Sequence, residues 1–138
     1  MCAYPNFFRC SVPFMLAFLV IGNAQAEWAL LGRTDTFRIY IDKGTSQKNG
    51  SIVRTSQLID FVAAQWVDAQ TVIMSVKSLV DFDCAESKLR ILTVETYSEQ
   101  MTGGRLVANE KFPSPEWESI QSGSSAEVAH KFACSENR

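Results

Sequence analysis

The sequence predicts an α+β fold: an antiparallel β-sheet followed by a short C-terminal helix that one disulfide links to it. Three observations predict this fold. Most of the chain after residue 36 alternates apolar and polar residues with a period of two, which is typical of half-buried strands. A helical pattern appears only near the C-terminus, at Ser125–Cys134. Cys84 ends the clearest strand and Cys134 ends the helical segment, so a bridge between them would join sheet and helix.

Residues Met1–Ala26 have the features of a cleaved signal peptide. One basic residue, Arg9, precedes the apolar run Pro13–Gly22, and the small-residue pattern Ala24-Gln25-Ala26 follows, as a secretory peptidase requires. The apolar run is about half of the ~20 residues needed to cross a bilayer, so a retained anchor is the weaker alternative. We expect cleavage after Ala26, with no membrane span in the mature protein.

The mature chain, Glu27–Arg138, is then 112 residues long and forms a single domain. Removal of Arg9 leaves 12 basic and 15 acidic residues, a net charge of −3. Nucleic-acid binding requires a concentrated basic surface, and no such run exists in the sequence. Nucleic acid is therefore excluded as an expected partner.

Two cysteines remain in the mature chain, because Cys2 and Cys10 leave with the signal peptide. In an oxidising compartment Cys84 and Cys134 are expected to pair and to close a loop of about 50 residues, which is worth roughly 4 kcal/mol. The alternative, half of a metal site, needs further ligands, but His130 is the sole histidine and no CxxC motif exists. We expect no metal and no cofactor.

The first strands are indicated by alternation and turn residues. Thr36–Asp42 places three apolar side chains on one face and Arg38 and Tyr40 on the other. Turn residues occupy 42–50, and Asn49-Gly50 before a β-branched run predicts a hairpin into the strand Ser51–Phe61. Ala63–Gln70 is weakly patterned and is interpreted as a loop or a short helical turn.

The following strands are predicted at Val72–Cys84, Lys88–Tyr97 and Arg105–Phe112. In the first of these, Cys84 shares its parity with the apolar residues, so alternation directs it into the core. Ala85-Glu86-Ser87 and Gly103-Gly104 form the turns. Connections this short indicate antiparallel pairing rather than βαβ crossovers.

The character of the chain changes after Phe112. Pro113-Ser114-Pro115 cannot continue a ladder, because proline has no amide donor. Ser124 and Glu127 have the spacing of a capping box at a helix start. The helix Ser125–Cys134 is expected to be amphipathic, with an apolar stripe formed by Val128 and Phe132 one turn apart and Ala129 and Ala133 beside them.

No catalytic constellation is found, and we expect a non-enzymatic protein without catalytic residues. His130 is the only imidazole and no Gly-x-Ser-x-Gly elbow exists, so His130 is interpreted as a surface residue of the helix. Asp81 and Asp83 lie two residues apart on one strand face, where they could hold a cation or act as acid and base. Without other carboxylates nearby in sequence, a solvated strand face is the favoured interpretation.

Surface recognition is the remaining function class. Arg38, Tyr40, Arg54 and Lys77 lie on outward strand faces and are the candidate binding residues. A small antiparallel sheet also has edge strands, which can pair with a protein ligand or with a second copy to give a homodimer.

Short motifs spread over Glu27–Arg138 resemble the surface-adhesin protein E-like family of Gram-negative bacteria. In chain order they are Trp28, Tyr40-Ile41-Asp42, Gly50-Ser51-Ile52-Val53-Arg54, Ser75–Cys84 (SVKSLVDFDC), Lys88–Leu92 (KLRIL), Tyr97-Ser98, Met101-x-Gly-Gly, Pro115-x-Trp117 and a terminal helix closing on Cys134.

The resemblance implies a sheet of about six antiparallel strands with the C-terminal helix tied to it by the cysteine pair. It also implies an exported protein of the periplasm or outer cell surface, and, in the family's namesake, adhesion to host extracellular-matrix proteins. The alternative is a periplasmic accessory or enzyme-inhibitor protein that binds one partner 1:1 through a protruding loop such as Asp42–Gly50 or Gln100–Arg105.

Overall fold

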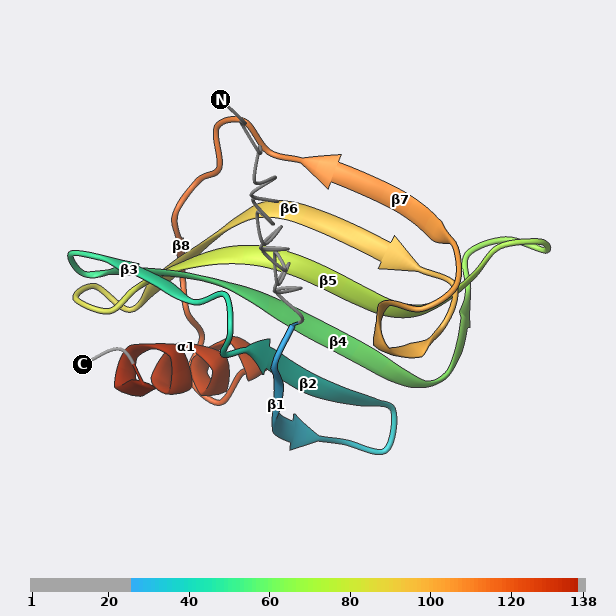
Figure 1. Cartoon of the computed structure of the whole chain (residues 1–138), viewed down its shortest axis with the longest axis horizontal. Coiled ribbons are helices and arrows are strands. Elements are labelled where there is room, and N and C mark those ends of the chain that lie inside the picture. The colour runs from blue at the N-terminus through green and yellow to red at the C-terminus, as the bar shows by residue number, and fades with distance from the viewer. Residues whose placement is uncertain (1–25, 137–138) are drawn as a thin grey trace, which may run out of the picture.

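An antiparallel β-sheet forms most of the chain in the computed structural model, which describes residues 26–136 (Figure 1). Its strands are β1 (Trp28–Arg33), β2 (Phe37–Asp42), β3 (Gln47–Asn49), β4 (Ile52–Trp66), β5 (Val72–Asp83), β6 (Lys88–Tyr97), β7 (Leu106–Lys111) and β8 (Glu118–Ser119). A 3₁₀ turn, η1 (Gln100–Thr102), precedes β7, and the helix α1 (Ser125–Glu136) follows β8. The predicted signal peptide, Met1–Ala26, lies outside the described residues except for Ala26.

The structure confirms the predicted α+β class. Six strands lie side by side in the order β1-β2-β4-β5-β6-β7, while β3 adds to β4 and β8 adds to β6. Every pairing is antiparallel. The predicted Asn-Gly hairpin joins β3 to β4: Asn49 lies opposite Ile52, and Gly50 adopts a φ of 62° that favours glycine.

The segment interpreted as a loop or helical turn, Ala63–Gln70, is instead the outer part of a long hairpin. Strand β4 continues to Trp66, after a register shift between Asp60 and Gln65, and pairs again with β5. Asp68 closes the turn by accepting the amide hydrogens of Gln70 and Thr71. The hairpin therefore projects beyond the sheet as an arm, seen at the right of Figure 1.

The main core lies between α1 and one face of the sheet. Its fully buried members come from β2, β4, β5 and α1: Ile41, Val53, Val80, Phe82, Ala129 and Ala133. The predicted stripe is wrong at Val128, which is 46% exposed, whereas Phe132 is partly buried against the core and Ala129 and Ala133 are fully buried. Small side chains allow the helix to approach the sheet closely, and that approach brings the Cα atoms of Cys84 and Cys134 to 5.7 Å.

The helix begins with half of the predicted capping box. The amide of Glu127 donates to Ser124 Oγ at 3.2 Å, as the motif requires. The Glu127 carboxylate returns to the amide of Gly123, at 2.7 Å, instead of that of Ser124. It also pairs with Lys131 one turn later, so Glu127 holds the first two turns together.

Replacing the buried helix residue Ala129 with leucine is expected to lower the free energy of unfolding by about 1–3 kcal/mol. The added carbons have no space between helix and sheet, because Ala129 is 0% exposed. Urea unfolding measures the change. The control is Val128→Leu, one residue earlier on the exposed face of the same helix, for which a change within about 0.5 kcal/mol is expected. Equal effects of the two substitutions would contradict this helix orientation.

Candidate binding surface

All four predicted binding residues lie on the sheet face opposite α1. Tyr40 is paired with Leu58, which is paired with Lys77, so these three side chains form a row across the sheet. Arg38 and Arg54 occupy positions of the same parity in β2 and β4. We call the surface defined by Arg38, Tyr40, Arg54 and Lys77 the polar face.

A groove of about 420 Å³ crosses the polar face. It is lined by residues of β1, β2, β3, β4, β5 and η1, among them Trp28, Asp42, Gln47, Arg54, Lys77, Leu79 and Thr102, and by Ala26, which the predicted cleavage would remove. Two of the four predicted binding residues, Arg54 and Lys77, therefore meet in one hollow. Arg38 and Tyr40 are not part of its lining.

One end of the polar face is covered by η1. Asp60 accepts the amide hydrogen of Met101 at 2.7 Å, and Ser75 Oγ accepts that of Thr102 at 3.0 Å. Asp60 and Ser75 are buried as a result. The loop Gln100–Arg105 therefore does not protrude over its whole length, because its first half packs against the sheet.

A cluster of two arginines and one aspartate lies next to the groove. Arg54 donates to Asp81 from Nε (2.7 Å) and Nη2 (2.9 Å), and Arg90 donates from Nε (3.0 Å) and Nη2 (2.9 Å). The Asp81 side chain is 0% exposed, while those of Arg54 and Arg90 are 44% and 30% exposed. We call these three residues the Arg–Asp–Arg cluster. It presents guanidinium groups to solvent and hides its only carboxylate.

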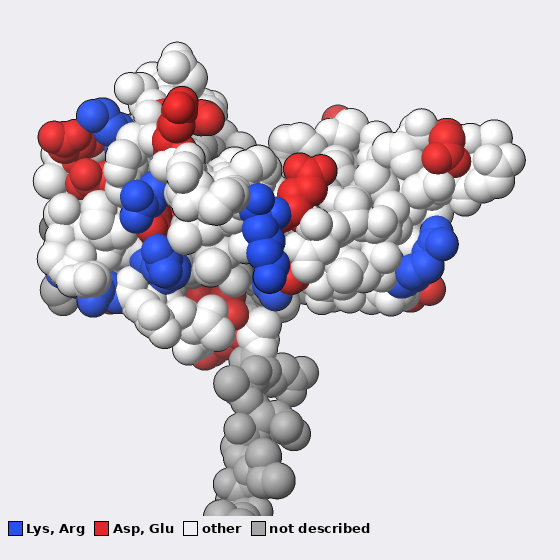
Figure 2. Space-filling model, turned by 90° about the horizontal axis from the view of Figure 1, so that it is seen from above, with Lys and Arg blue, Asp and Glu red and all other residues white. Residues whose placement is uncertain are grey.

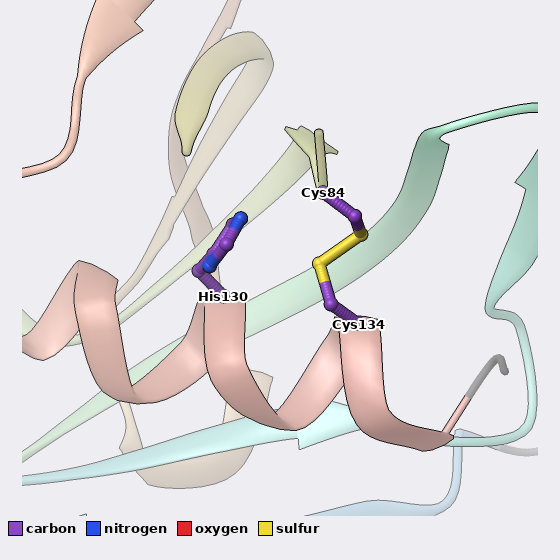
Figure 3. Close-up of side chains that lie close together, drawn as sticks. All are labelled: Cys84, His130 and Cys134. Carbon is purple, nitrogen blue, oxygen red and sulfur yellow. A yellow bond between two sulfur atoms is a disulfide. The ribbon is translucent and has the colours of Figure 1, made fainter. Parts of the chain in front are cut away.

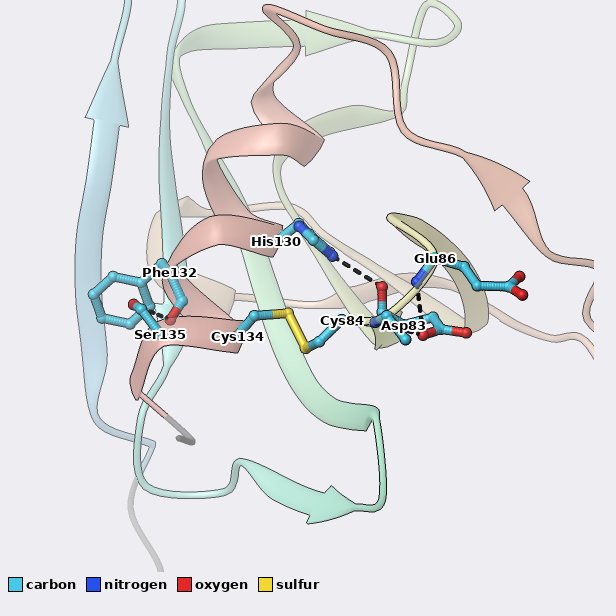
Figure 4. Close-up of a disulfide and its surroundings, with 8 residues drawn as sticks. Asp83, Cys84, Glu86, His130, Phe132, Cys134 and Ser135 are labelled. Atoms are coloured by element: carbon cyan, nitrogen blue, oxygen red, sulfur yellow. Dashed lines mark hydrogen bonds between the residues drawn. A yellow bond between two sulfur atoms is a disulfide. The ribbon is translucent and has the colours of Figure 1, made fainter.

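The interpretation of Asp81 as part of a solvated strand face is wrong. Burial acts to raise the pKa of Asp81, but the hydrogen bonds and charges of Arg54 and Arg90 outweigh it and hold that pKa below its ordinary value. Asp81 is thus an ionised structural acceptor. Asp83 has a different role, since its carboxylate accepts the amides of Ala85 and Glu86 in the following turn (Figure 4).

Other charges of the polar face are neutralised locally. Lys77 Nζ lies 3.3 Å from Glu95 Oε2, and Arg38 Nη1 lies 3.9 Å from Asp60 Oδ2. Figure 2 shows basic and acidic groups interspersed on the visible face, without a continuous basic track. The face is therefore unlike the surface that binds a dense polyanion.

The arm is a second exposed feature, and the sequence reading missed it. Trp66 at 68% exposed and Val67 at 58% exposed lie at its tip. A tryptophan this exposed is more typical of a contact surface than of a core. The sequence signals the arm in one way only: the segment is apolar but lacks a clear strand alternation.

The predicted disulfide between Cys84 and Cys134 joins the end of β5 to α1. His130 lies beside it, one helical turn before Cys134 (Figure 3). The prediction that His130 is a surface residue is wrong, because it is half-buried and its Nε2 donates to the backbone oxygen of Asp83 at 2.9 Å (Figure 4). Its ring also meets Phe82 edge-on. Although the two sulfurs and an imidazole nitrogen lie within 4.8 Å, the sulfurs are bonded to each other and offer no thiolate to a metal.

Two residues at the Arg–Asp–Arg cluster, Arg90 and Trp117, were not among the predicted binding residues. Trp117 precedes β8, and the guanidinium of Arg90 stacks on its ring at 4.4 Å from the centroid. The pairing of Arg90 with Asp81 could have been predicted from the sequence. These residues lie at opposite positions about the turn Ala85-Glu86-Ser87, so an antiparallel hairpin places them side by side.

Within residues 26–136, no helix combines the length and apolar character needed to cross a membrane. No match was found among curated proteins. Solved structures of Haemophilus influenzae protein E share the fold. One is 14% identical, with a TM-score of 0.56, and the alignment covers 77% of this chain and 92% of that one. A second is 13% identical, with a TM-score of 0.56 and coverage of 81% and 93%.

The family described as surface-adhesin protein E matches residues 28–135, almost the whole described part of the chain. The sequence motifs, the antiparallel sheet and the disulfide-linked C-terminal helix agree with this match. The chain belongs to the surface-adhesin protein E family.

Proposed function

We propose that this protein is an exported, non-enzymatic surface adhesin that binds host extracellular-matrix proteins through the polar face. The groove carries this proposal, because it gathers Arg54, Lys77 and Trp28 into one hollow beside the Arg–Asp–Arg cluster. Arginine and tryptophan are the side chains that most often dominate protein interfaces. Family membership supports the adhesive role.

Export with cleavage after Ala26 is supported by the surroundings of Glu27. Its backbone nitrogen donates to Asp42 Oδ1 at 2.9 Å, and Asp42 is 2% exposed. Cleavage would convert this nitrogen into an ammonium group beside a buried carboxylate, a stronger, charge-assisted hydrogen bond. N-terminal sequencing of the exported protein should begin at Glu27, and a chain that still begins at Met1 would contradict the proposal.

Truncating two predicted contact residues, Tyr40→Ala with Lys77→Ala, is expected to weaken binding to immobilised laminin, fibronectin or collagen by about tenfold. Both residues lie in the row that crosses the polar face. Surface plasmon resonance measures the affinity, with circular dichroism to verify folding. The matched control is Lys131→Ala on α1, a 71% exposed lysine on the other side of the sheet, which should bind like the wild type. Wild-type protein that binds none of the three, or a double variant that binds normally, would reject the proposal.

The alternative, a periplasmic accessory or inhibitor protein that binds 1:1, is favoured by one observation, the arm with exposed Trp66 and Val67. A projecting apolar tip can fill a cleft of a partner. Protease treatment of intact cells separates the two functions, since an adhesin is digested at the surface and a periplasmic protein is protected.

A homodimer through a sheet edge remains part of the proposal. Strands β1 and β7 terminate the strand order, so within residues 26–136 each has one edge without a neighbouring strand. Light scattering during gel filtration would show a mass of twice the chain if a second copy pairs there.

A further inference from the structure

We propose that the Arg–Asp–Arg cluster is a subsite for the carboxylate of an acidic sugar, a uronic or sialic acid unit of a glycan. This inference rests on the proposed adhesive function and specifies the ligand chemistry of one part of the polar face. It is carried by the geometry of Arg54, Asp81 and Arg90 and by the residues around them.

The cluster has unused donors in fixed positions. Each guanidinium carries five N–H groups, and Asp81 accepts two from Arg54 and two from Arg90, so three remain on each arginine. The buried carboxylate of Asp81 fixes one end of both side chains, and Trp117 stacks against Arg90. Two arginines against one aspartate leave a net charge of +1. A ligand carboxylate would meet donors whose orientation is already set.

The hollow beside the cluster suits a sugar. It has a volume of about 220 Å³, and its lining adds Gln47, Asn49 and Ile52 to the three charged residues. Gln47 and Asn49 are exposed, and their amides can donate to and accept from hydroxyl groups. Asp81 is the only carboxylate in this lining, and its oxygens are turned to the arginines. An acidic peptide would find little apolar surface there, since Ile52 is the single apolar residue.

The surrounding charge favours a ligand with isolated carboxylates. Lys77 and Arg38 are paired with Glu95 and Asp60, so a densely sulfated chain would meet few additional free cations on this face. A glycan with one carboxylate for every two or three sugars places a single anion in the cluster and hydroxyl groups beside it. Such a ligand matches one net positive charge flanked by amides.

The test is an NMR titration of the folded wild-type protein with 3′-sialyllactose, a hyaluronan tetrasaccharide and, as the neutral control, lactose. Binding at the subsite should shift the Nε–H signals of Arg54 and Arg90 and the indole signal of Trp117 with either acidic sugar. 3′-Sialyllactose carries a sialic acid and hyaluronan carries a uronic acid, so the probe that binds more tightly identifies the acid that the subsite prefers. No shift at these groups at millimolar concentrations, or equal shifts with lactose, would overturn the proposal. A stronger response to an acidic peptide, or to a dextran sulfate oligosaccharide that carries sulfates but no carboxylate, would also overturn it.

Arg54→Lys gives an independent readout, because lysine keeps the charge beside Asp81 but loses the planar pair of donors. The acidic sugar should bind about tenfold more weakly. Arg33→Lys, an exposed position of β1 outside the lining of the hollow, should bind as the wild type does. Matrix-protein binding is measured on the same variants. If the wild-type protein binds matrix proteins normally but binds neither acidic sugar, the subsite is wrong and the adhesive function stands; if the wild type binds no matrix protein either, both are wrong.

Discussion

Replacing both Cys84 and Cys134 with alanine is expected to lower the free energy of unfolding by about 4 kcal/mol. The bridge closes a loop with a sequence separation of 50 residues, and the unfolded chain gains the freedom of that loop when the bridge is absent. A domain of this size has a stability of about 5–15 kcal/mol, so the loss is a large part of the total. Urea unfolding followed by far-UV circular dichroism measures it.

The helix should be affected more than the sheet. Helix α1 has 12 residues, which is marginal in water without tertiary contacts, and the bridge is its covalent attachment to β5. Besides the bridge, Ala129, Ala133 and His130 attach it. Hydrogen exchange should therefore show faster exchange in α1 than in β4 and β5 of the double variant. Adding a reducing agent to this variant should not change its stability further. If a reducing agent also fails to destabilise the wild type, the bridge does not form in solution.

Four of the described strands were predictable because each depends on local sequence, whereas β1 was not predicted. Period-two alternation and turn residues located β2, β5, β6 and β7 to within about one residue of the observed ends. The two-residue strand β8 has no such pattern, since it exists only by pairing with the end of β6. The outer part of β4 is similar: Ala63 and Ala64 have low strand propensity and lie within the register shift, and the pairing of Gln65 and Trp66 with β5 beyond them keeps this segment extended.

The candidate site was less predictable, because alternation assigns a residue to a face but does not say what covers that face. Arg54 and Lys77 were correctly placed on one side of their strands, yet the burial of Asp81 beneath two arginines depends on the register of three strands. Helix α1 shows the same limit. Val128 was expected to face the sheet, but the close approach of helix and sheet buries the small side chains of Ala129 and Ala133 and leaves Val128 exposed.

Replacing Asp81 with asparagine is expected to lower the free energy of unfolding by about 3 kcal/mol, near the lower end of the range for breaking a buried ion pair. The asparagine amide would turn a donor toward the donors of Arg54 and Arg90, and two cations would remain side by side. The lower end applies because both arginines are partly exposed, so water can accept some of their N–H groups. Urea unfolding at neutral pH measures the difference.

The control is Asp83→Asn, two residues later in the same strand. Asparagine retains an oxygen that can accept the amides of Ala85 and Glu86, so a change below about 1 kcal/mol is expected. Equal losses for the two substitutions would show that the Arg–Asp–Arg cluster does not hold its ions in the folded protein.

The dependence on pH isolates the charge of Asp81 from its shape. The pKa of Asp81 lies below its ordinary value of 3.8 in the folded protein, so its stabilising contribution is complete above that value. As the pH falls from 3.8 through the lowered pKa, the folded state must take up a proton and the contribution is lost. A protonated Asp81 then resembles the asparagine of the variant. The gap in stability between wild type and Asp81→Asn should therefore be widest at neutral pH and should narrow in strong acid, whereas a gap that stays constant would mean that packing, not the ion pairs, holds this face of the sheet.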